Sequence, residues 1–334
     1  MPSLPKPRLR RSARARADGS AHPQAPPEPQ VEIVESDGLR WINIERPSPV
    51  DRAWLEEHFD FHPLDYEDLH SRNQRPKVDE YDDYLFIVLH FPAYDKTVGR
   101  LNAAELDIFV GPDFVITLPN EPIQPLEYLF ERCKTREDVR RQLFSRGPGY
   151  LLYKVVDDCV DASFPMLRKM GNKLERIEEE IFEGRGEEIV RDISNAKQEI
   201  INFRKVIRPQ RPVLRDLEKV KSRYLSPDFD LEIYFDDIVD SHERIWDMLE
   251  NYKEVIEALE ETNESVISHR FNDVLRILTV FSIVFLPATL IASIWGMNVG
   301  VPGEGNDFDF FLVIGSMLVI LFGMLAYFRR RGWL

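Results

Sequence analysis

Two long uncharged stretches lie near the C-terminal end of the sequence, separated by a short turn-rich segment. No charged side chain occurs between Arg276 and Glu304, and residues 277–295 form an uncharged run of 19 residues. A second uncharged run of 19 residues covers 310–328. About 20 apolar residues in a helix cross the hydrocarbon core of a bilayer, and helices in soluble proteins rarely reach this length without a polar face. The pattern therefore predicts two transmembrane helices, at about 274–295 and at 310–328.

The basic residues around these spans predict their orientation. Arg270 and Arg276 precede the first span, and Arg329–Arg331 begin a basic end, 329–334, after the second. The loop 296–309 contains acidic residues but neither Lys nor Arg. The positive-inside rule then places both termini in the cytoplasm and the loop outside. We expect a multi-pass protein of the plasma (inner) membrane, without a secretory signal, because no apolar segment follows Met1.

A long polar helix is predicted immediately before the first span. Residues 228–286 contain neither Gly nor Pro, and Ser226-Pro227 is a helix-start signal, so one helix over 226–295 is expected to run into the membrane. It would be about 90–100 Å long at ~1.5 Å per residue. Apolar residues recur at steps of three and four along its cytoplasmic part, interrupted by His242 and Asn263: Phe235, Ile238, Ile245, Leu249, Tyr252, Ile256, Leu259 and Val266. This stalk seam has coiled-coil spacing and needs a partner, either other copies of the helix or helices of its own chain.

The residues before the stalk predict a cytoplasmic part with two regions. Strand-like and helix-like patterns alternate over 31–145, which indicates an α/β domain, and heavily charged helical patterns follow over 149–225, which indicate a helical hairpin broken at 184–186. Strands are expected at 31–34, 41–44 and 84–90, and a hairpin at 105–110 and 114–118. Residues 1–30 are rich in Pro, Ala and Arg and are expected to be disordered, either solvated or in weak contact with anionic lipid headgroups. The predicted fold class is an α+β membrane protein with an N-terminal α/β domain, a helical stalk and two C-terminal transmembrane helices.

Composition excludes several classes of function. The net charge of −15 over 334 residues argues against a nucleic-acid partner and is compatible with cation handling. Cys133 and Cys159 are the only cysteines, so neither a disulfide framework nor a thiolate metal site is expected. The sequence shows no Gly-rich phosphate loop, nucleophile elbow or His/Cys cluster, so we expect neither an enzyme nor a prosthetic group. The acidic cluster of Glu175 and Glu178–Glu180 is either a solvated helix face or a loose divalent-cation site.

The first span has a polar face that a simple anchor would not need. Residues at steps of three and four share this face: Asn272, Leu275, Thr279, Ser282, Leu286, Thr289 and Ser293. Polar groups within a bilayer face protein or water, so the face either lines a pore or packs against other helices with its hydroxyls bonded to the backbone. Pro287 lies mid-span, where it frees a backbone carbonyl.

Several motifs resemble the CorA family of magnesium transporters. Trp295-Gly296-Met297-Asn298 is similar to that family's Gly-Met-Asn signature, and 272–298 resembles its entire first span. The end Trp333-Leu334 is similar as well. Upstream, the segments 62–64, 74–78 and 86–89 resemble the family's cytoplasmic domain. The resemblance covers roughly residue 31 to the end of the sequence.

The resemblance implies a homopentameric divalent-cation channel that transports Mg²⁺ passively. Five first spans would line the pore, with Gly296, Met297 and Asn298 as the selectivity filter. The pore-lining positions would be Asn272, Leu275, Leu278, Thr279, Ser282, Leu286 and Thr289, with the leucines forming an apolar constriction that closes by dewetting. Since Mg²⁺ sheds its waters reluctantly, a ring of Asn298 amide oxygens would accept hydrogen bonds from the hydrated ion. Cytoplasmic Mg²⁺ would hold the pore shut by bridging Asp95 and Asp237 of neighbouring subunits.

The external loop departs from the usual pattern of the family. Trp295 replaces the usual Tyr, and the loop 299–304 is Gly- and Pro-rich, although Glu304 can still supply an external acidic ring. Such a loop also resembles the zinc-transporting branch. The expected cargo is therefore Mg²⁺, with Co²⁺ and Ni²⁺ also carried. The alternative is a Zn²⁺ transporter, and a proton-coupled mechanism would belong with that alternative. An alternative of another class is a non-conducting, membrane-anchored sensor or scaffold.

Overall fold

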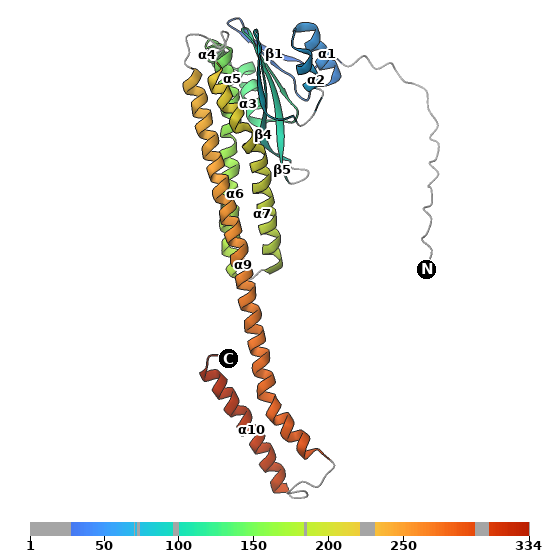
Figure 1. Cartoon of the computed structure of the whole chain (residues 1–334), viewed down its shortest axis with the longest axis vertical. Helices are drawn as coiled ribbons and strands as arrows, with labels where there is room; N and C mark the ends of the chain where they lie inside the picture. Colours follow the sequence, from blue (N-terminus) through green and yellow to red (C-terminus); the bar gives the residue numbers. More distant parts are fainter. Residues whose placement is uncertain are drawn as a thin grey trace, which may run out of the picture.

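The chain forms an elongated molecule with a sheet domain at one end and a pair of apolar helices at the other (Figure 1). The computed structural model describes residues 28–69, 71, 74–95, 100–183, 186–220, 231–297 and 307–333. The predicted tail lies almost entirely outside these residues, as does the predicted helix start at Ser226. The N-terminal α/β sheet domain, the long helix and the two apolar C-terminal helices confirm the predicted fold class.

The described part of the sheet domain forms six strands in the order β1-β2-β6-β5-β4-β3. The strands are β1 (Glu32–Ser36), β2 (Leu39–Asn43), β3 (Lys77–Glu80), β4 (Leu85–Asp95), β5 (Arg100–Val110) and β6 (Phe114–Pro119). Only β2 and β6 pair in parallel, and every other neighbouring pair is antiparallel. It follows that β2, β6 and β4 run in one direction and end at the same edge of the sheet. The β4–β5 hairpin extends beyond that edge, because Pro119 at the end of β6 pairs with Leu106, well inside β5.

Helices cover both faces of this sheet. On one face α1 (Pro49–His58) and α2 (Pro63–Asp68) pack over Ile42, Phe86, Phe109 and Ile116. The other face carries α3 (Gln124–Thr135), α4 (Glu137–Phe144) and α5 (Pro148–Asp161), and α7 (Gly186–Ile207) also packs there (Figure 1). The start of α1 follows its sequence signal, since the Ser48 amide donates to Asp51 Oδ2 at 2.7 Å and the Asp51 amide donates to Ser48 Oγ at 3.4 Å.

Within the described residues, the helical region before the stalk forms four α-helices, whereas the sequence predicts a hairpin of two. α5 ends at Asp161, and α6 (Ser163–Glu183) starts after one intervening residue; α7 passes through a short 3₁₀ turn (Arg208–Gln210) into α8 (Arg211–Lys219). Pro209 lies in the 3₁₀ turn and Pro212 in the first turn of α8, where the missing amide hydrogen breaks the regular helix. α6 and α7 are the two arms of the hairpin that the sequence indicates.

Helices of the same chain fill much of the stalk seam. The stalk is α9 (Leu231–Trp295), and its Ile238, Ile245, Leu249 and Ile256 are at most 1% exposed in the core shared with α5 to α8. Ion pairs border this packing, including Lys197–Glu260 at 2.6 Å and Arg215–Glu243 at 2.7 Å. Of the two partners left open by the spacing, helices of its own chain thus occupy this part of the seam.

The polar interruption at His242 has a structural cause. His242 is 3% exposed, and its Nε2 lies 2.9 Å from the carbonyl oxygen of Ile207. Ile207 ends α7, where the change to a 3₁₀ turn leaves a carbonyl without its regular partner. A donor at position 242 satisfies this buried acceptor, and burial keeps the pKa of His242 below its usual value. The imidazole is therefore neutral at physiological pH.

Candidate functional site

The lower part of α9 and all of α10 (Asp307–Arg330) form the apolar end of the molecule. Both helices are long and apolar enough to cross a membrane. Only 11% of the most apolar window of α9 and 6% of that of α10 is buried within the chain. A core helix of a soluble protein would be mostly buried, so these exposed apolar surfaces favour lipid or further protein as their surroundings.

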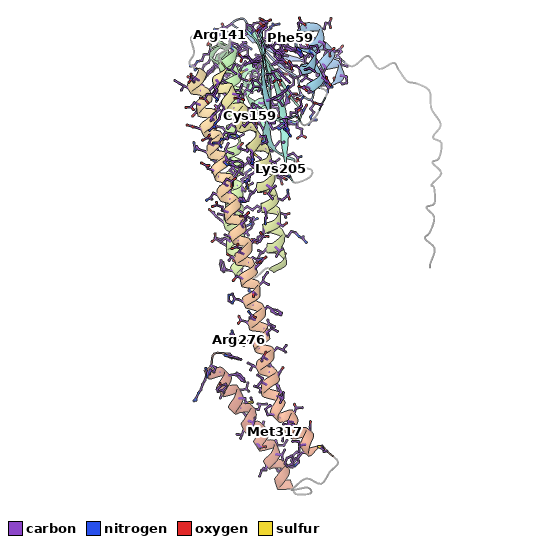
Figure 2. The ribbon with its side chains drawn as sticks, in the orientation of Figure 1. Phe59, Arg141, Cys159, Lys205, Arg276 and Met317 are labelled. Atoms are coloured by element: carbon purple, nitrogen blue, oxygen red, sulfur yellow. The ribbon has the colours of Figure 1, made fainter. Side chains whose placement is uncertain are left out.

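α10 packs beside α9 along one narrow strip (Figure 1). Val280 and Val284 of α9 are 1% and 2% exposed and form a small core with Phe328, and Leu321, Met324 and Leu325 border it. Figure 2 places Arg276 on α9 beside the C-terminal end of α10. The basic residues of the two helices therefore lie at the same end, as the positive-inside orientation requires.

The basic end of α10 is held by a defined helix cap. The Trp333 amide donates to the Phe328 carbonyl at 3.0 Å, and the Gly332 amide donates to the Arg329 carbonyl at 3.2 Å. Gly332 has φ +71°, a left-handed conformation that glycine adopts without strain. The Trp333 ring lies 5.7 Å from the Phe328 ring. This cap turns the chain back toward the α9 contact and keeps Arg329 and Arg330 in the last helical turn.

The predicted pore-lining residues lie on the opposite side of α9 from α10. We call this the uncovered face; it consists of Asn272, Leu275, Leu278, Thr279, Ser282, Leu286 and Thr289, all of which are exposed in the single chain. At ~100° per residue, its mean direction lies roughly 160° from the Val280 and Val284 strip. Leu278 and Leu286 are 61% and 65% exposed. The structure thus brings these positions together on one face without covering them.

The hydroxyl groups of the uncovered face bond to their own helix. Thr279 Oγ1 donates to the Leu275 carbonyl at 2.7 Å, and Ser282 Oγ donates to the Leu278 carbonyl at 2.9 Å. Thr289 Oγ1 donates likewise to the Phe285 carbonyl at 2.9 Å. These bonds are the backbone bonding that the sequence leaves open as an alternative to a pore. They use the hydroxyl hydrogens and leave oxygen lone pairs as acceptors, which is the polarity that a hydrated cation requires.

Two residues of the predicted selectivity filter, Gly296 and Met297, lie within the described residues. α9 ends at Trp295, and the Gly296 amide donates to the Ala292 carbonyl at 2.9 Å. A Cβ at position 296 would lie 3.1 Å from that same carbonyl oxygen, closer than most Cβ contacts. Met297 is 57% exposed. Asn298 and Glu304 lie outside the described residues.

The two predicted regulatory aspartates lie on different elements. Asp95 ends β4, and its backbone pairs with Arg100 at the tip of the β4–β5 hairpin. Asp237 is exposed near the start of α9, close enough to α5 to contribute to the raised pKa values of Tyr153 and Asp161, which burial raises most. Figure 1 shows that the hairpin tip and the start of α9 lie at opposite ends of the sheet domain.

Within the described part of the chain, no group of three or more His, Cys, Asp or Glu residues could hold a metal ion. This includes the acidic residues Glu178–Glu180, where Glu180 lies 3.8 Å from Arg176.

The sequence pattern did not identify the strip that holds α10. Val280 and Val284 are spaced four residues apart on the side opposite the polar face. Their signal is weak, because β-branched apolar residues also surround them on the lipid-exposed sides. The polar face of α9 is easier to find in the sequence, and the contact with α10 lies on the opposite side of the helix from it.

Comparison with known proteins shows which family the chain resembles over most of its length. Residues 36–330 match the family model described as "CorA-like Mg2+ transporter protein". The chain is 31% identical over 308 residues to the cobalt/magnesium transport protein CorA of Thermotoga maritima, covering 90% of this chain and 85% of that one. The solved structure of the CorA magnesium transporter from Methanocaldococcus jannaschii superposes with a TM-score of 0.78 at 24% identity, covering 91% of this chain and 94% of the other.

A less similar relative is named as a transporter of a different ion, zinc. The zinc transport protein ZntB of Yersinia enterocolitica is 18% identical over 302 residues, covering 88% of both chains. The match to the family model, residues 36–330, extends over the sheet domain, the stalk and both apolar helices. With a family model that covers most of its length, this chain belongs to the CorA-like Mg²⁺ transporter family.

Proposed function

We propose that the protein is a homopentameric channel of the plasma (inner) membrane that conducts Mg²⁺ passively and closes when cytoplasmic Mg²⁺ rises. Membership of the family makes it a divalent metal ion transporter in the membrane and not an enzyme. The observation that carries the finer proposal is the uncovered face of α9, which presents acceptor oxygens and leucines on the side away from α10.

The uncovered face is best satisfied in a ring of identical helices. A single helix cannot enclose water, and hydroxyl oxygens that face lipid would find no hydrogen-bond donor for their remaining lone pairs. Five copies around an axis would turn Thr279, Ser282 and Thr289 toward a central water column. Leu278 and Leu286 would then form apolar rings that close by dewetting when the helices approach. α10 would remain outside, between α9 and the lipid.

Selection would occur at the external mouth. Five Asn298 side chains would present neutral amide oxygens to the waters around Mg²⁺, an ion that is costly to dehydrate. A neutral ring binds weakly enough to release the ion, which conduction requires, and a Glu304 ring could concentrate cations outside it. Co²⁺ and Ni²⁺, which form hexahydrated ions of similar size, would also pass.

The alternative cargo is Zn²⁺ in a proton-coupled process, which the Gly- and Pro-rich loop and the relative named as a zinc transporter support. Against proton coupling, residues 277–295 and 310–328 contain no ionisable acid, base or histidine that could relay a proton. Tyr327 is the single titratable side chain there, and it adjoins the basic end. We therefore rank Mg²⁺ first.

Ion flux into liposomes that contain the purified protein tests this function. We expect Mg²⁺ uptake driven by voltage alone, with Co²⁺ and Ni²⁺ also carried, and no dependence on an imposed pH gradient. Zn²⁺ uptake that requires the pH gradient would instead establish the alternative. An oligomer of the right size that conducts no ion would favour the non-conducting scaffold.

Closure by cytoplasmic Mg²⁺ depends on Asp237 in our proposal. Two facing carboxylates repel one another until a cation bridges them, so internal Mg²⁺ stabilises the closed arrangement by differential binding. Replacing Asp237 by Ala should remove a charged ligand worth roughly 1.5–3 kcal/mol and raise the half-inhibitory Mg²⁺ concentration about tenfold or more. The measurement is flux against internal Mg²⁺, with Asp236→Ala on the same exposed turn as the control. Identical inhibition curves for Asp237→Ala and the unaltered protein would refute this role.

A further inference from the structure

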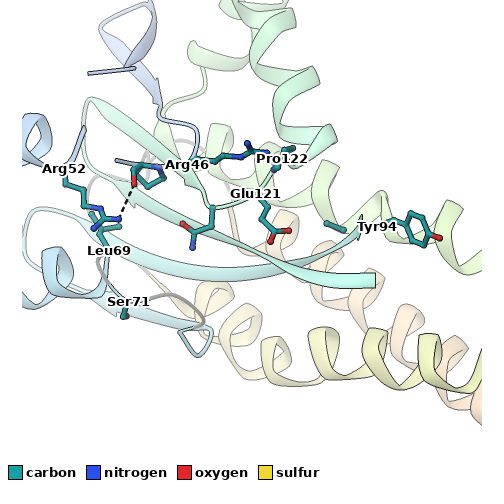
Figure 3. A pocket seen from close by; sticks show the side chains of 10 residues that line it. Arg46, Arg52, Leu69, Ser71, Tyr94, Glu121 and Pro122 are labelled. Atoms are coloured by element: carbon teal, nitrogen blue, oxygen red, sulfur yellow. Dashed lines mark hydrogen bonds between the residues drawn. The ribbon is translucent and has the colours of Figure 1, made fainter. Parts of the chain in front are cut away.

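A cavity lies at the edge of the sheet where β2, β6 and β4 end (Figure 3). Its volume is about 590 Å³, within the range of small-molecule sites. Arg46 and Pro47 line it from the loop after β2, and Asn120 and Glu121 line it from the loop after β6. Arg52 of α1 enters from one side, and the β4 residue Tyr94 lies at the far end of the view.

The topology of the sheet makes this edge a preferred place for a ligand. β2 and β6 are adjacent and parallel, yet they lead to helices on opposite faces: α1 packs on one face through Leu55, and α3 packs on the other through Leu126 and Phe130. Where adjacent parallel strands lead to opposite faces, their loops diverge and leave a crevice outside the carboxyl ends. The part of the β4–β5 hairpin that extends past β6 closes this crevice on one side.

The cavity presents two cations with carboxylates in their neighbourhood: Asp51 and Asp107 interact electrostatically with Arg52, and Glu127 interacts with Arg46. Within the described residues neither Arg46 nor Arg52 forms an ion pair, although the chain carries a net charge of −15. Arg52 donates from Nη2 to the Pro47 carbonyl at 3.2 Å, while its buried Nε has no hydrogen-bond partner. A guanidinium offers five N–H donors, so most of its capacity here is unused. Glu121 is the single carboxylate in the lining, which leaves the lining with one net positive charge.

Arg46 is also held in a backbone conformation that its own residue type disfavours. Its φ is +50°, and among the described residues the other non-glycine with positive φ is Asp37, which lies in the Asp-Gly turn between β1 and β2. The Arg46 amide donates to the Pro119 carbonyl at 2.9 Å, which continues the β2–β6 ladder to the cavity rim. Non-glycine residues with positive φ persist where the surroundings fix them, often at ligand sites.

We propose that this cavity binds a phosphate group, either as free phosphate or as part of a small phosphate monoester. Asn120 Nδ2 donates one hydrogen to Glu105 Oε1 at 2.7 Å and has a second amide hydrogen to offer. Two guanidinium groups and this neutral donor suit an anion with three or more oxygens better than a carboxylate with two. Arg46 and Arg52 are the anion-binding residues. The site uses no residue of α9 or α10, so it stands independently of ion conduction.

Equilibrium binding to the full-length protein in detergent micelles tests the site. Calorimetric titrations with inorganic phosphate and with AMP are made in the presence of EDTA, so that divalent cations do not bridge protein and ligand. We expect binding of at least one of the two, weakened by salt because it is electrostatic. Tight binding of phosphate alone identifies free phosphate as the ligand, and tight binding of AMP alone identifies a monoester.

Three arginine variants determine whether binding takes place at the cavity. Arg46→Gln and Arg52→Gln should each weaken binding about tenfold or more, as expected for loss of a charge-assisted bidentate contact. Arg40→Gln is the matched control, because Arg40 lies on β2 but pairs with Asp113 at the opposite edge of the sheet. Arg46 is exposed, so its replacement should leave folding intact even if Arg52→Gln is unstable. No binding of either ligand at millimolar concentration, or binding equally strong in Arg46→Gln, overturns the proposal.

Discussion

Replacing Asn298 by Ala should abolish selective Mg²⁺ uptake while leaving the oligomer intact. In the proposed pore this change removes all five amide oxygens from the external mouth at once. Each hydrogen bond to ion-bound water is worth roughly 1 kcal/mol. Losing only about half of the summed energy of these five bonds would already lower Mg²⁺ occupancy of the mouth on the order of a hundredfold. No other side chain that we place at the mouth offers a neutral oxygen in its place.

Mg²⁺ flux in liposomes under a fixed voltage measures this effect, together with the size of the detergent-solubilised oligomer. The control is Asn251→Ala, which makes the same chemical change on an exposed turn of the cytoplasmic part of α9. We expect unchanged flux from the control and little or none from Asn298→Ala. Full flux from Asn298→Ala would remove the motif from the selectivity mechanism, and equal inactivity of the unaltered protein would favour the scaffold.

Long helices without interruption were the part of the fold that could be predicted best from the sequence. The absence of Gly and Pro from 228–286 predicts one continuous helix, and α9 is continuous from Leu231 to Trp295. Pro287 does not end it, since the missing amide hydrogen costs one bond in a helix held by many. The second apolar run likewise appears as α10, with one extra turn at its start. Local periodicity suffices for such elements because each residue's environment is set by its own helix.

Contacts between segments far apart in the sequence were harder to predict from the sequence. The spacing of Ile245, Leu249 and Ile256 is the same whether the seam packs against another copy or against α6 and α7. His242 looked like an interruption, although its donor satisfies the Ile207 carbonyl on a helix 35 residues away in sequence. A buried polar residue in an apolar stripe indicates an acceptor nearby, but the stripe does not reveal which chain or element supplies it.

The cavity at the end of β2 could not be predicted from sequence for the same reason. Arg46 and Arg52 are near one another in sequence, but their site requires β6 to lie beside β2, a pairing between segments about 75 residues apart. The left-handed backbone at Arg46 has no glycine to signal it. The pore face was visible because its residues share one helix, whereas this crevice exists only after the sheet has formed.

The uncovered face can be tested directly by placing a single reactive cysteine on it. The two native cysteines should not react with the thiol reagent. Cys133 and Cys159 are at most 2% exposed. Burial raises the pKa of Cys133 to about 11 and raises that of Cys159 further above its usual range. Thiolates are the reactive species, so neither should react with a charged methanethiosulfonate. Ser282→Cys is a small change at an exposed position, and Val284→Cys is its control, 2% exposed against α10 and only about 3 Å further along the axis.

We expect a positively charged reagent to block Mg²⁺ flux at least about tenfold in Ser282→Cys, because a fixed positive charge on a water-filled column repels the cation at a barrier cost above 1.4 kcal/mol. Val284→Cys should keep its flux. The proposed leucine rings lie on both sides of Ser282, so modification should be fast when internal Mg²⁺ is absent and slow when it is high. This state dependence separates a pore from a packing surface, since a face buried between helices would exclude the reagent at every Mg²⁺ concentration. Modification of both positions at the same rate would show that the uncovered face does not line the conduction path.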